Sequence, residues 1–82
     1  MENGIKEVNG VLVIKPQVEY IDSTNALELK NFILEYVGKG KQKILIDLSE
    51  VAVIDSTGLG AVIAIYKAIK NQGTLLLCGL LA

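Results

Sequence analysis

The sequence predicts an α/β domain with a mixed β-sheet, and three observations support this. The pair Asn9-Gly10 joins two short aliphatic runs, which is the pattern of a β-hairpin. Two segments with helical spacing of apolar residues each lie between predicted strands. Such β-α-β crossovers imply parallel pairing of the flanking strands. At 82 residues the chain has room for one domain, residues 1–82, with the element order β-β-α-β-α-β.

Turn and capping residues predict the first half of the fold. The strands of the hairpin are residues 5–8 and 11–14, and Pro16 ends the second because proline has no N–H to donate. The polar residues 22–25 offer several helix N-caps. The helix that follows ends at Gly38, and its periodic apolar residues are Ala26, Leu29, Ile33, Tyr36 and Val37.

The second half is predicted to hold a strand, a helix and a final strand. Residues 44–46 form a short aliphatic run after a polar loop, which suits a strand buried on both faces. A second helix is predicted from Leu59 to Ile69, with an apolar stripe of Leu59, Val62, Ile63 and Tyr66. Residues 74–78 form the last apolar strand.

The composition excludes several classes of function. Hydrophobic residues make up 51% of the chain and the mean hydropathy is +0.47, which excludes intrinsic disorder. The net charge is −1 and there is no arginine, so the chain is a poor match to nucleic-acid binding. Because histidine is absent, His-based catalysis and His metal sites are excluded. We therefore expect no enzyme activity, no metal and no cofactor.

Cysteine usage and hydropathy bear on the compartment. The single cysteine, Cys78, lies in an apolar run and is expected to be a buried, reduced residue. The N-terminus lacks the pattern of a signal peptide, and the longest apolar stretch, residues 51–66, is too short to span a bilayer. We expect a cytoplasmic protein with neither a membrane nor a nucleic acid as its partner.

Residues 55–60, Asp-Ser-Thr-Gly-Leu-Gly, are the strongest candidate site. Taken alone, they are most simply a helix N-cap, because Asp and Ser both cap helices well. The spacing fits neither a dinucleotide fingerprint, which needs a third glycine at Ile63, nor the G-x-S-x-G turn of a serine hydrolase. Two glycines in one helical turn cost about 1 kcal/mol each relative to alanine, which suggests a close approach to the backbone.

Two further features favour a binding role for this helix start. The helix is apolar nearly all round, so its first two turns are a candidate contact surface. Ser56 is also well placed for phosphorylation, which adds about −1.5 to −2 charges. Inside an interface, that charge beside Asp55 would disrupt binding without rearranging the fold.

The segment also resembles a known family signature. Asp47-Leu48-Ser49, Val51 and Ile54 to Gly60 closely match the pattern D-L-S-x-V-x-x-I/M-D-S-S/A-G-L-G of the STAS domain, the fold of bacterial anti-sigma factor antagonists. Residues 21–30 resemble the family's first helix with its preceding aspartate, and residues 75–80 resemble the strand after the signature helix. The resemblance covers nearly the whole chain.

The resemblance implies a phosphorylation switch. Ser56 takes the position of the phosphoacceptor, Asp22 that of a flanking acid, and Asp55 that of the residue that positions the serine. The dephosphorylated form would bind an anti-sigma factor that is itself a serine kinase, and a phosphatase would reset the phosphorylated form. ATP and magnesium would belong to the kinase. The implied partner-binding residues are Asp22, Ser23, Asp55, Ser56, Thr57, Gly58, Leu59 and Gly60.

The chain departs from the family pattern in two respects. Glu19 stands where the family has a glycine, and the usual C-terminal helix-strand-helix is absent after Leu80. Two alternatives therefore stay open: a STAS scaffold without a switch, as in stress-signalling, lipid-transport or anion-transport complexes, or a fragment without a complete function. Thr57 also remains an alternative acceptor. Because the apolar residues exceed what so short a chain can bury, we expect self-association, as a dimer with or without exchanged elements.

Overall fold

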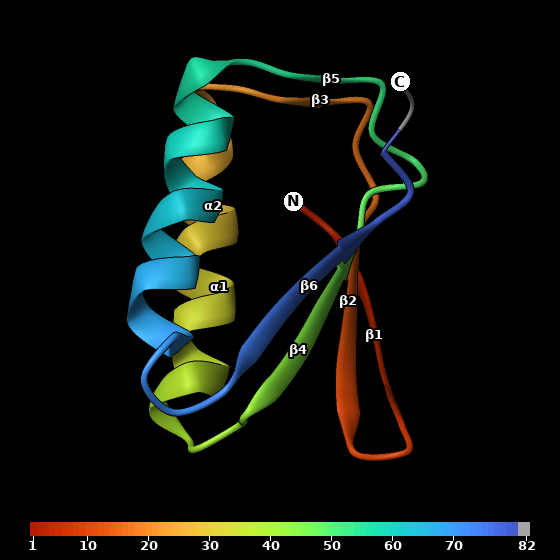
Figure 1. The fold of residues 1–82 in the computed structure, drawn as a ribbon. Coiled ribbons are helices and arrows are strands. Elements are labelled where there is room, and N and C mark those ends of the chain that lie inside the picture. Colours follow the sequence, from red (N-terminus) through yellow and green to blue (C-terminus); the bar gives the residue numbers. More distant parts are fainter. Residues whose placement is uncertain (81–82) are drawn as a thin grey trace.

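A computed structural model describes residues 1–80 as a sheet with two helices on one of its faces (Figure 1). The elements follow the chain in the order β1 (Asn3–Val8), β2 (Val11–Pro16), β3 (Tyr20–Ile21), α1 (Ala26–Gly38), β4 (Lys43–Asp47), β5 (Val53–Ile54), α2 (Ser56–Ile69) and β6 (Thr74–Cys78).

The main sheet has the strand order β1-β2-β4-β6. Strands β1 and β2 pair antiparallel through a turn in which Asn9 and Gly10 both have positive φ, at 52° and 82°. Positive φ at both central residues is what a two-residue hairpin turn requires. Strand β4 pairs in parallel with β2 on one side and with β6 on the other. The predicted mixed sheet, with its hairpin and two β-α-β crossovers, is confirmed.

The core lies between the sheet and the helices. Strands β2 and β4 contribute Ile14, Ile44 and Ile46, all fully buried against helical residues that are equally buried: Leu29, Ile33, Ile65 and Ile69. The prediction that β4 is buried on both faces is wrong. Leu45 points to the face away from the helices and is half-buried, because both helices lie on the other face (Figure 1).

The sequence did not predict β3 and β5, which form a separate two-stranded parallel sheet. Tyr20 pairs with Val53 and Ile21 with Ile54. The carbonyl oxygen of Glu19 accepts hydrogen bonds from the N–H groups of Ala52 at 2.7 Å and Val53 at 3.1 Å. In Figure 1 this pair runs from the end of the main sheet to the start of both helices. It therefore positions the two helix N-termini together.

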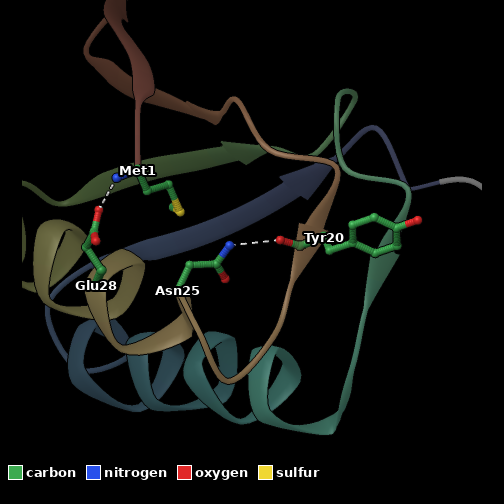
Figure 2. Close-up of polar contacts among 4 residues, drawn as sticks. All are labelled: Met1, Tyr20, Asn25 and Glu28. Atoms are coloured by element: carbon green, nitrogen blue, oxygen red, sulfur yellow. Dashed lines mark hydrogen bonds and ion pairs between the residues drawn. The ribbon is translucent and has the colours of Figure 1, made fainter.

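The start of the chain is tied to the start of α1 (Figure 2). The N-terminal ammonium of Met1 lies 2.6 Å from a carboxylate oxygen of Glu28, and Met1 packs against the core. Asn25, which precedes α1, donates from its side-chain amide to the carbonyl oxygen of Tyr20 at 2.9 Å. The first turn of α1 is thus fastened both to β3 and to the N-terminus.

Helix α2 presents a different face to the core from its predicted stripe. Of the stripe residues, only Val62 is buried, whereas Leu59, Ile63 and Tyr66 are 55%, 46% and 53% exposed. The buried face comprises Gly58, Ala61, Val62, Ile65 and Ile69. Because this helix is apolar nearly all round, spacing alone did not identify its buried face. Within residues 1–80 neither helix has the length and apolar character needed to cross a membrane.

Strand β6 is an edge strand, and this overturns one prediction. Cys78 is exposed, whereas its apolar neighbours predicted a buried thiol. Leu76 and Leu77 are also 49% and 42% exposed. A strand at the edge of a sheet has a neighbouring strand on one side only, so its side chains are less covered than those of a central strand. Apolar neighbours in sequence therefore do not ensure burial.

Candidate functional site

The candidate site lies where β3 and β5 end. The parallel register pairs Ile21 with Ile54, so the residues that follow them, Asp22 and Asp55, leave the two strands at the same edge. The N–H of Asp55 donates to the carbonyl oxygen of Ile21 at 3.1 Å, which extends the pairing by one step. Two aspartates 33 positions apart in sequence are thereby brought to one end of the molecule.

Asp55 is the N-cap of α2. Its backbone is extended, with φ −85° and ψ −175°, and its side-chain carboxylate accepts a hydrogen bond from the N–H of Gly58 at 2.9 Å. A capping carboxylate satisfies an N–H that the first helical turn leaves without a partner. Ser56 is consequently the first residue of α2, and its side chain is exposed. The predicted cap is confirmed.

Asp22 organises the chain before α1. Its carboxylate accepts hydrogen bonds from the Thr24 hydroxyl at 2.6 Å and from the Thr24 N–H at 2.9 Å. These two bonds, the hydroxyl first, hold the pKa of the Asp22 carboxyl below its ordinary value. The side-chain oxygen of Asn25 accepts from the Asp22 N–H at 3.0 Å, and Asn25 is the N-cap residue of α1. Ser23, between them, is exposed.

Gly58 has a structural reason to be glycine. It is buried, and a Cβ atom there would lie 2.7 Å from the Ile54 Cγ2 atom and 2.8 Å from the Ile21 carbonyl oxygen. The start of α2 therefore packs directly on the β3–β5 pair. The close approach to the backbone that the two glycines predicted is thus confirmed at Gly58. At Gly60 an added Cβ would meet no atom within 4 Å, so no such approach occurs there.

An apolar groove runs between the two helices beside this site. It has a volume of about 170 Å³ and is lined by Leu27 and Lys30 from α1 and by Thr57, Gly60 and Ala64 from α2. Leu27, at 62% exposure, was not among the candidate site residues predicted from the sequence. The signal for it was present, because Leu27 is an apolar residue outside the predicted buried stripe of α1.

The exposed face of α2 continues the site along the helix. Ser56, Leu59, Ile63 and Tyr66 follow each other at intervals of three or four residues, so they lie on one face. We call Leu59, Ile63 and Tyr66 the exposed α2 stripe. It joins the serine at the helix start to an apolar surface, which supports the contact surface predicted for the first two turns.

The electrostatic character of this end is acidic. The segments 17–25 and 48–60 contain four carboxylates and no lysine, and the carboxylates are Glu19, Asp22, Glu50 and Asp55. The positive end of the α2 dipole points toward the same region. Among residues 1–80 no group of three or more His, Cys, Asp or Glu side chains is arranged to hold a metal ion.

Of the predicted site residues, the structure brings Asp22, Asp55 and Ser56 to one end of the molecule. Thr57 and Gly60 line the groove between the helices, and Leu59 is exposed next to them. Gly58 differs from the others, because its backbone faces inward onto Ile21 and Ile54. It therefore supports the site from beneath.

Known proteins resemble this chain in sequence and in fold. The family model for the STAS domain matches residues 4–81. A curated Thermotoga maritima protein named "Putative anti-sigma factor antagonist" is 36% identical over 69 residues, which are 83% of this chain and 60% of that protein. The Bordetella bronchiseptica protein named "Putative anti-sigma factor antagonist BtrV" is 31% identical over 81 residues, which are 98% of this chain and 69% of that protein.

A solved structure agrees with these sequence matches. The crystal structure of a Thermotoga maritima protein with the same description superposes with a TM-score of 0.84 at 31% identity, over 92% of this chain and 65% of that one. The chain thus spans 60% of the curated Thermotoga maritima relative's length and about two thirds of the length of the other two proteins.

Proposed function

Because this chain belongs to the STAS domain family, we propose that it is an anti-sigma factor antagonist that works in the cytoplasm as a phosphorylation switch. Dephosphorylated, it binds an anti-sigma factor that is itself a serine kinase. Phosphorylation of Ser56 by that kinase ends the interaction, and a phosphatase restores it. The chain itself has no catalytic role in this proposal, and ATP and magnesium are bound by the kinase.

The observation that carries the proposal is the position of Ser56. It is exposed at the first position of α2, next to the capping Asp55 and at the head of the exposed α2 stripe. A kinase can reach the hydroxyl from solvent without opening the fold. A partner that covers Leu59 and Ile63 would also cover Ser56, so modification and binding would concern the same surface.

The charge around Ser56 explains how phosphorylation would act. A phosphoserine adds about −1.5 to −2 charges at an end of the molecule that already carries Asp22 and Asp55. The helix dipole favours the phosphate by about 0.3–1 kcal/mol, so the fold tolerates it. A docked partner would instead have to desolvate the new charge, and that cost falls on binding.

The groove between the helices favours Ser56 over Thr57 as the acceptor. Thr57 lines that groove together with Ala26 and Leu27, whereas Ser56 is not among the residues lining it. Both Ser56 and Thr57 are exposed, and a partner seated in the groove would contact Thr57 directly. We propose that Ser56 is phosphorylated and that Thr57 contributes to the contact surface.

The test uses the purified chain, a serine-kinase anti-sigma factor from the same genome, and ATP. We expect intact mass spectrometry to show the addition of one phosphate to the wild type and to Thr57→Ala, and none to Ser56→Ala. Binding of the kinase should persist with Ser56→Ala and fall at least tenfold with Ser56→Glu. Phosphate on Thr57 alone, or on neither residue, contradicts the proposal.

A scaffold without a switch is the second candidate function. It is favoured by the apolar exposure that lies far from Ser56 in sequence, at Leu76 and Leu77 of the edge strand β6. Equal binding of the partner by Ser56→Ala and Ser56→Glu would support it over the switch.

We also propose that the chain self-associates through β6. Among residues 1–80, β4 is the one strand that pairs with β6 in the main sheet, so the outer edge of β6 presents hydrogen-bonding groups. Light scattering at micromolar concentration should give the mass of a dimer, and Leu77→Lys should shift it toward the monomer. A monomeric wild type at that concentration contradicts this part of the proposal.

A further inference from the structure

The face of the main sheet that points away from the helices carries a second apolar surface. Residues alternate between the two faces of a strand, so those that flank the buried Leu12, Ile14, Ile44 and Ile46 point away from α1 and α2 (Figure 1). Five aliphatic side chains lie on this face, which we call the open sheet face: Val8, Val11, Val13, Leu45 and Leu76. Val8 and Leu76 are exposed, Val11 and Leu45 are half-buried, and Val13 forms the buried floor at 9% exposure.

The strand register arranges this surface in a row. Lys6 pairs with Val13, Val13 with Leu45, and Leu45 with Leu76, so one residue of each strand lies in the same line across the sheet. A groove of about 420 Å³ follows the row, and Val8 and Leu76 beside it are 46% and 49% exposed. Each of the four strands therefore contributes to one continuous hollow.

The charges around the hollow are mostly positive. Lys6 lines it, Lys15 lines the adjoining depression with Val13, and Lys43 shares the face of Leu45 by alternation. Within residues 1–80 none of these three lysines takes part in an ion pair. Asp47 is the one carboxylate lining either depression. The chain as a whole carries −1, so this face is locally opposite in sign.

We propose that the open sheet face binds an amphipathic helix of a partner protein whose aliphatic residues are flanked by glutamate or aspartate. The aliphatic row offers apolar area to bury, and the lysines offer complementary charge at its rim, which sets orientation and association rate. A helix laid across four strands about 4.8 Å apart crosses about 14 Å, or about ten residues. Such a segment covers the row from Lys6 to Leu76.

The charges argue against a second copy as the occupant. Two open sheet faces brought together would place three lysines of each against three of the other, with one aspartate on each side to offset them. Like charges across an interface weaken it. The surface is also separate from the exposed α2 stripe, since the helices cover the opposite face of the sheet (Figure 1). This inference therefore does not depend on the proposed switch at Ser56.

The test is an NMR titration of the full chain with a designed helical peptide of about 15 residues, which carries a leucine stripe flanked by glutamates. We expect shifts of the amides of Lys6, Val13, Leu45 and Leu76, with binding that weakens as NaCl rises from about 0.05 M to about 0.5 M. The matched control peptide has lysines in place of the glutamates and should bind at least tenfold more weakly.

Variants locate the contact. Lys6→Glu changes an exposed residue and should weaken peptide binding about fivefold, whereas Lys67→Glu on α2 should leave it unchanged. Leu76→Gln should weaken it about tenfold, with dispersed amide signals confirming that the variant folds. Ser56→Glu should have no effect, which separates this proposal from the switch.

Four results would overturn the inference. The first is equal binding of both peptides, and the second is peptide shifts confined to Leu59, Ile63 and Tyr66. The third is a concentration dependence, without peptide, of the signals of Lys6 and Val13, which lie on β1 and β2 away from the β6 edge, since this would identify a second copy as the occupant of the face. The fourth is tighter binding to vesicles of phosphatidylglycerol than to the acidic peptide, which would indicate a membrane surface.

Discussion

The N–H of Asp55 donates to the carbonyl oxygen of Ile21 at 3.1 Å, so the residue that caps α2 is held by the residue that ends β3. The same Ile21 carbonyl oxygen lies 2.8 Å from where a Cβ of Gly58 would be. Cap, strand end and first helical turn are therefore packed as one unit, and Ser56 sits on its outer side. Substitutions within this unit should therefore lower the free energy of unfolding more than they weaken binding of the partner.

The two glycines of α2 should respond in opposite ways to alanine. Gly58→Ala places a methyl group against Ile21 and Ile54, and such overpacking costs about 1–3 kcal/mol of unfolding free energy. Gly60→Ala meets no atom within 4 Å and should stabilise by up to about 1 kcal/mol through helix propensity. Urea unfolding of both variants measures the difference. Equal effects at the two positions would contradict the close approach at Gly58.

The sequence identified the hairpin because Asn9-Gly10 has a local cause, namely positive φ at two successive residues. The cap formed by Asp55 was predictable for the same reason, because its hydrogen bond to the Gly58 N–H joins residues three positions apart. Strands β3 and β5 were missed because two residues each are too few to show alternation, and their pairing is set by contacts between Ile21 and Ile54. The exposure of Cys78 was missed because it also depends on tertiary structure, namely on β6 being the strand at the edge of the sheet.

The pKa of the Asp22 carboxyl should depend on the hydroxyl of Thr24, and with it the stability of the fold at acidic pH. Its pKa is lowered in the folded chain, chiefly by the Thr24 hydroxyl. A carboxyl with a lowered folded pKa stabilises the fold above its unfolded pKa of about 3.9, and this contribution is lost as the pH falls through the folded pKa. Thr24→Val should raise the pKa of Asp22 toward its ordinary value, and Thr24→Ser should keep it low. A carbon-detected NMR titration decides between these outcomes, and an unchanged pKa in Thr24→Val would refute the role of the hydroxyl.

Cys78 should react slowly with alkylating reagents although its side chain is exposed. Partial desolvation of the sulfur, and then the negative charge of Asp47, raise the pKa of the thiol, and the thiolate is the reactive form. Asp47→Asn removes that charge, so alkylation by iodoacetamide near pH 8 should be faster than in the wild type. Asp22→Asn removes a carboxylate that does not act on Cys78, and it serves as the control. Equal rates for Asp47→Asn and the wild type would show that Asp47 does not hold the thiol protonated.

The orientation of α2 can be tested with two isoleucines that are two positions apart and therefore lie on opposite sides of the helix. Ile65 is fully buried, so Ile65→Ala should cost about 2–4 kcal/mol of unfolding free energy through the cavity it leaves. Ile63 is 46% exposed on the α2 stripe, and Ile63→Ala should cost less than about 1 kcal/mol. If the stripe is the docking surface for the kinase, Ile63→Ala should instead weaken partner binding by about tenfold or more, measured by calorimetry. The same substitution would then lower stability at position 65 and weaken partner binding at position 63. A larger stability loss for Ile63→Ala than for Ile65→Ala would mean that the helix is rotated, and with it the surface that joins Ser56 to Tyr66.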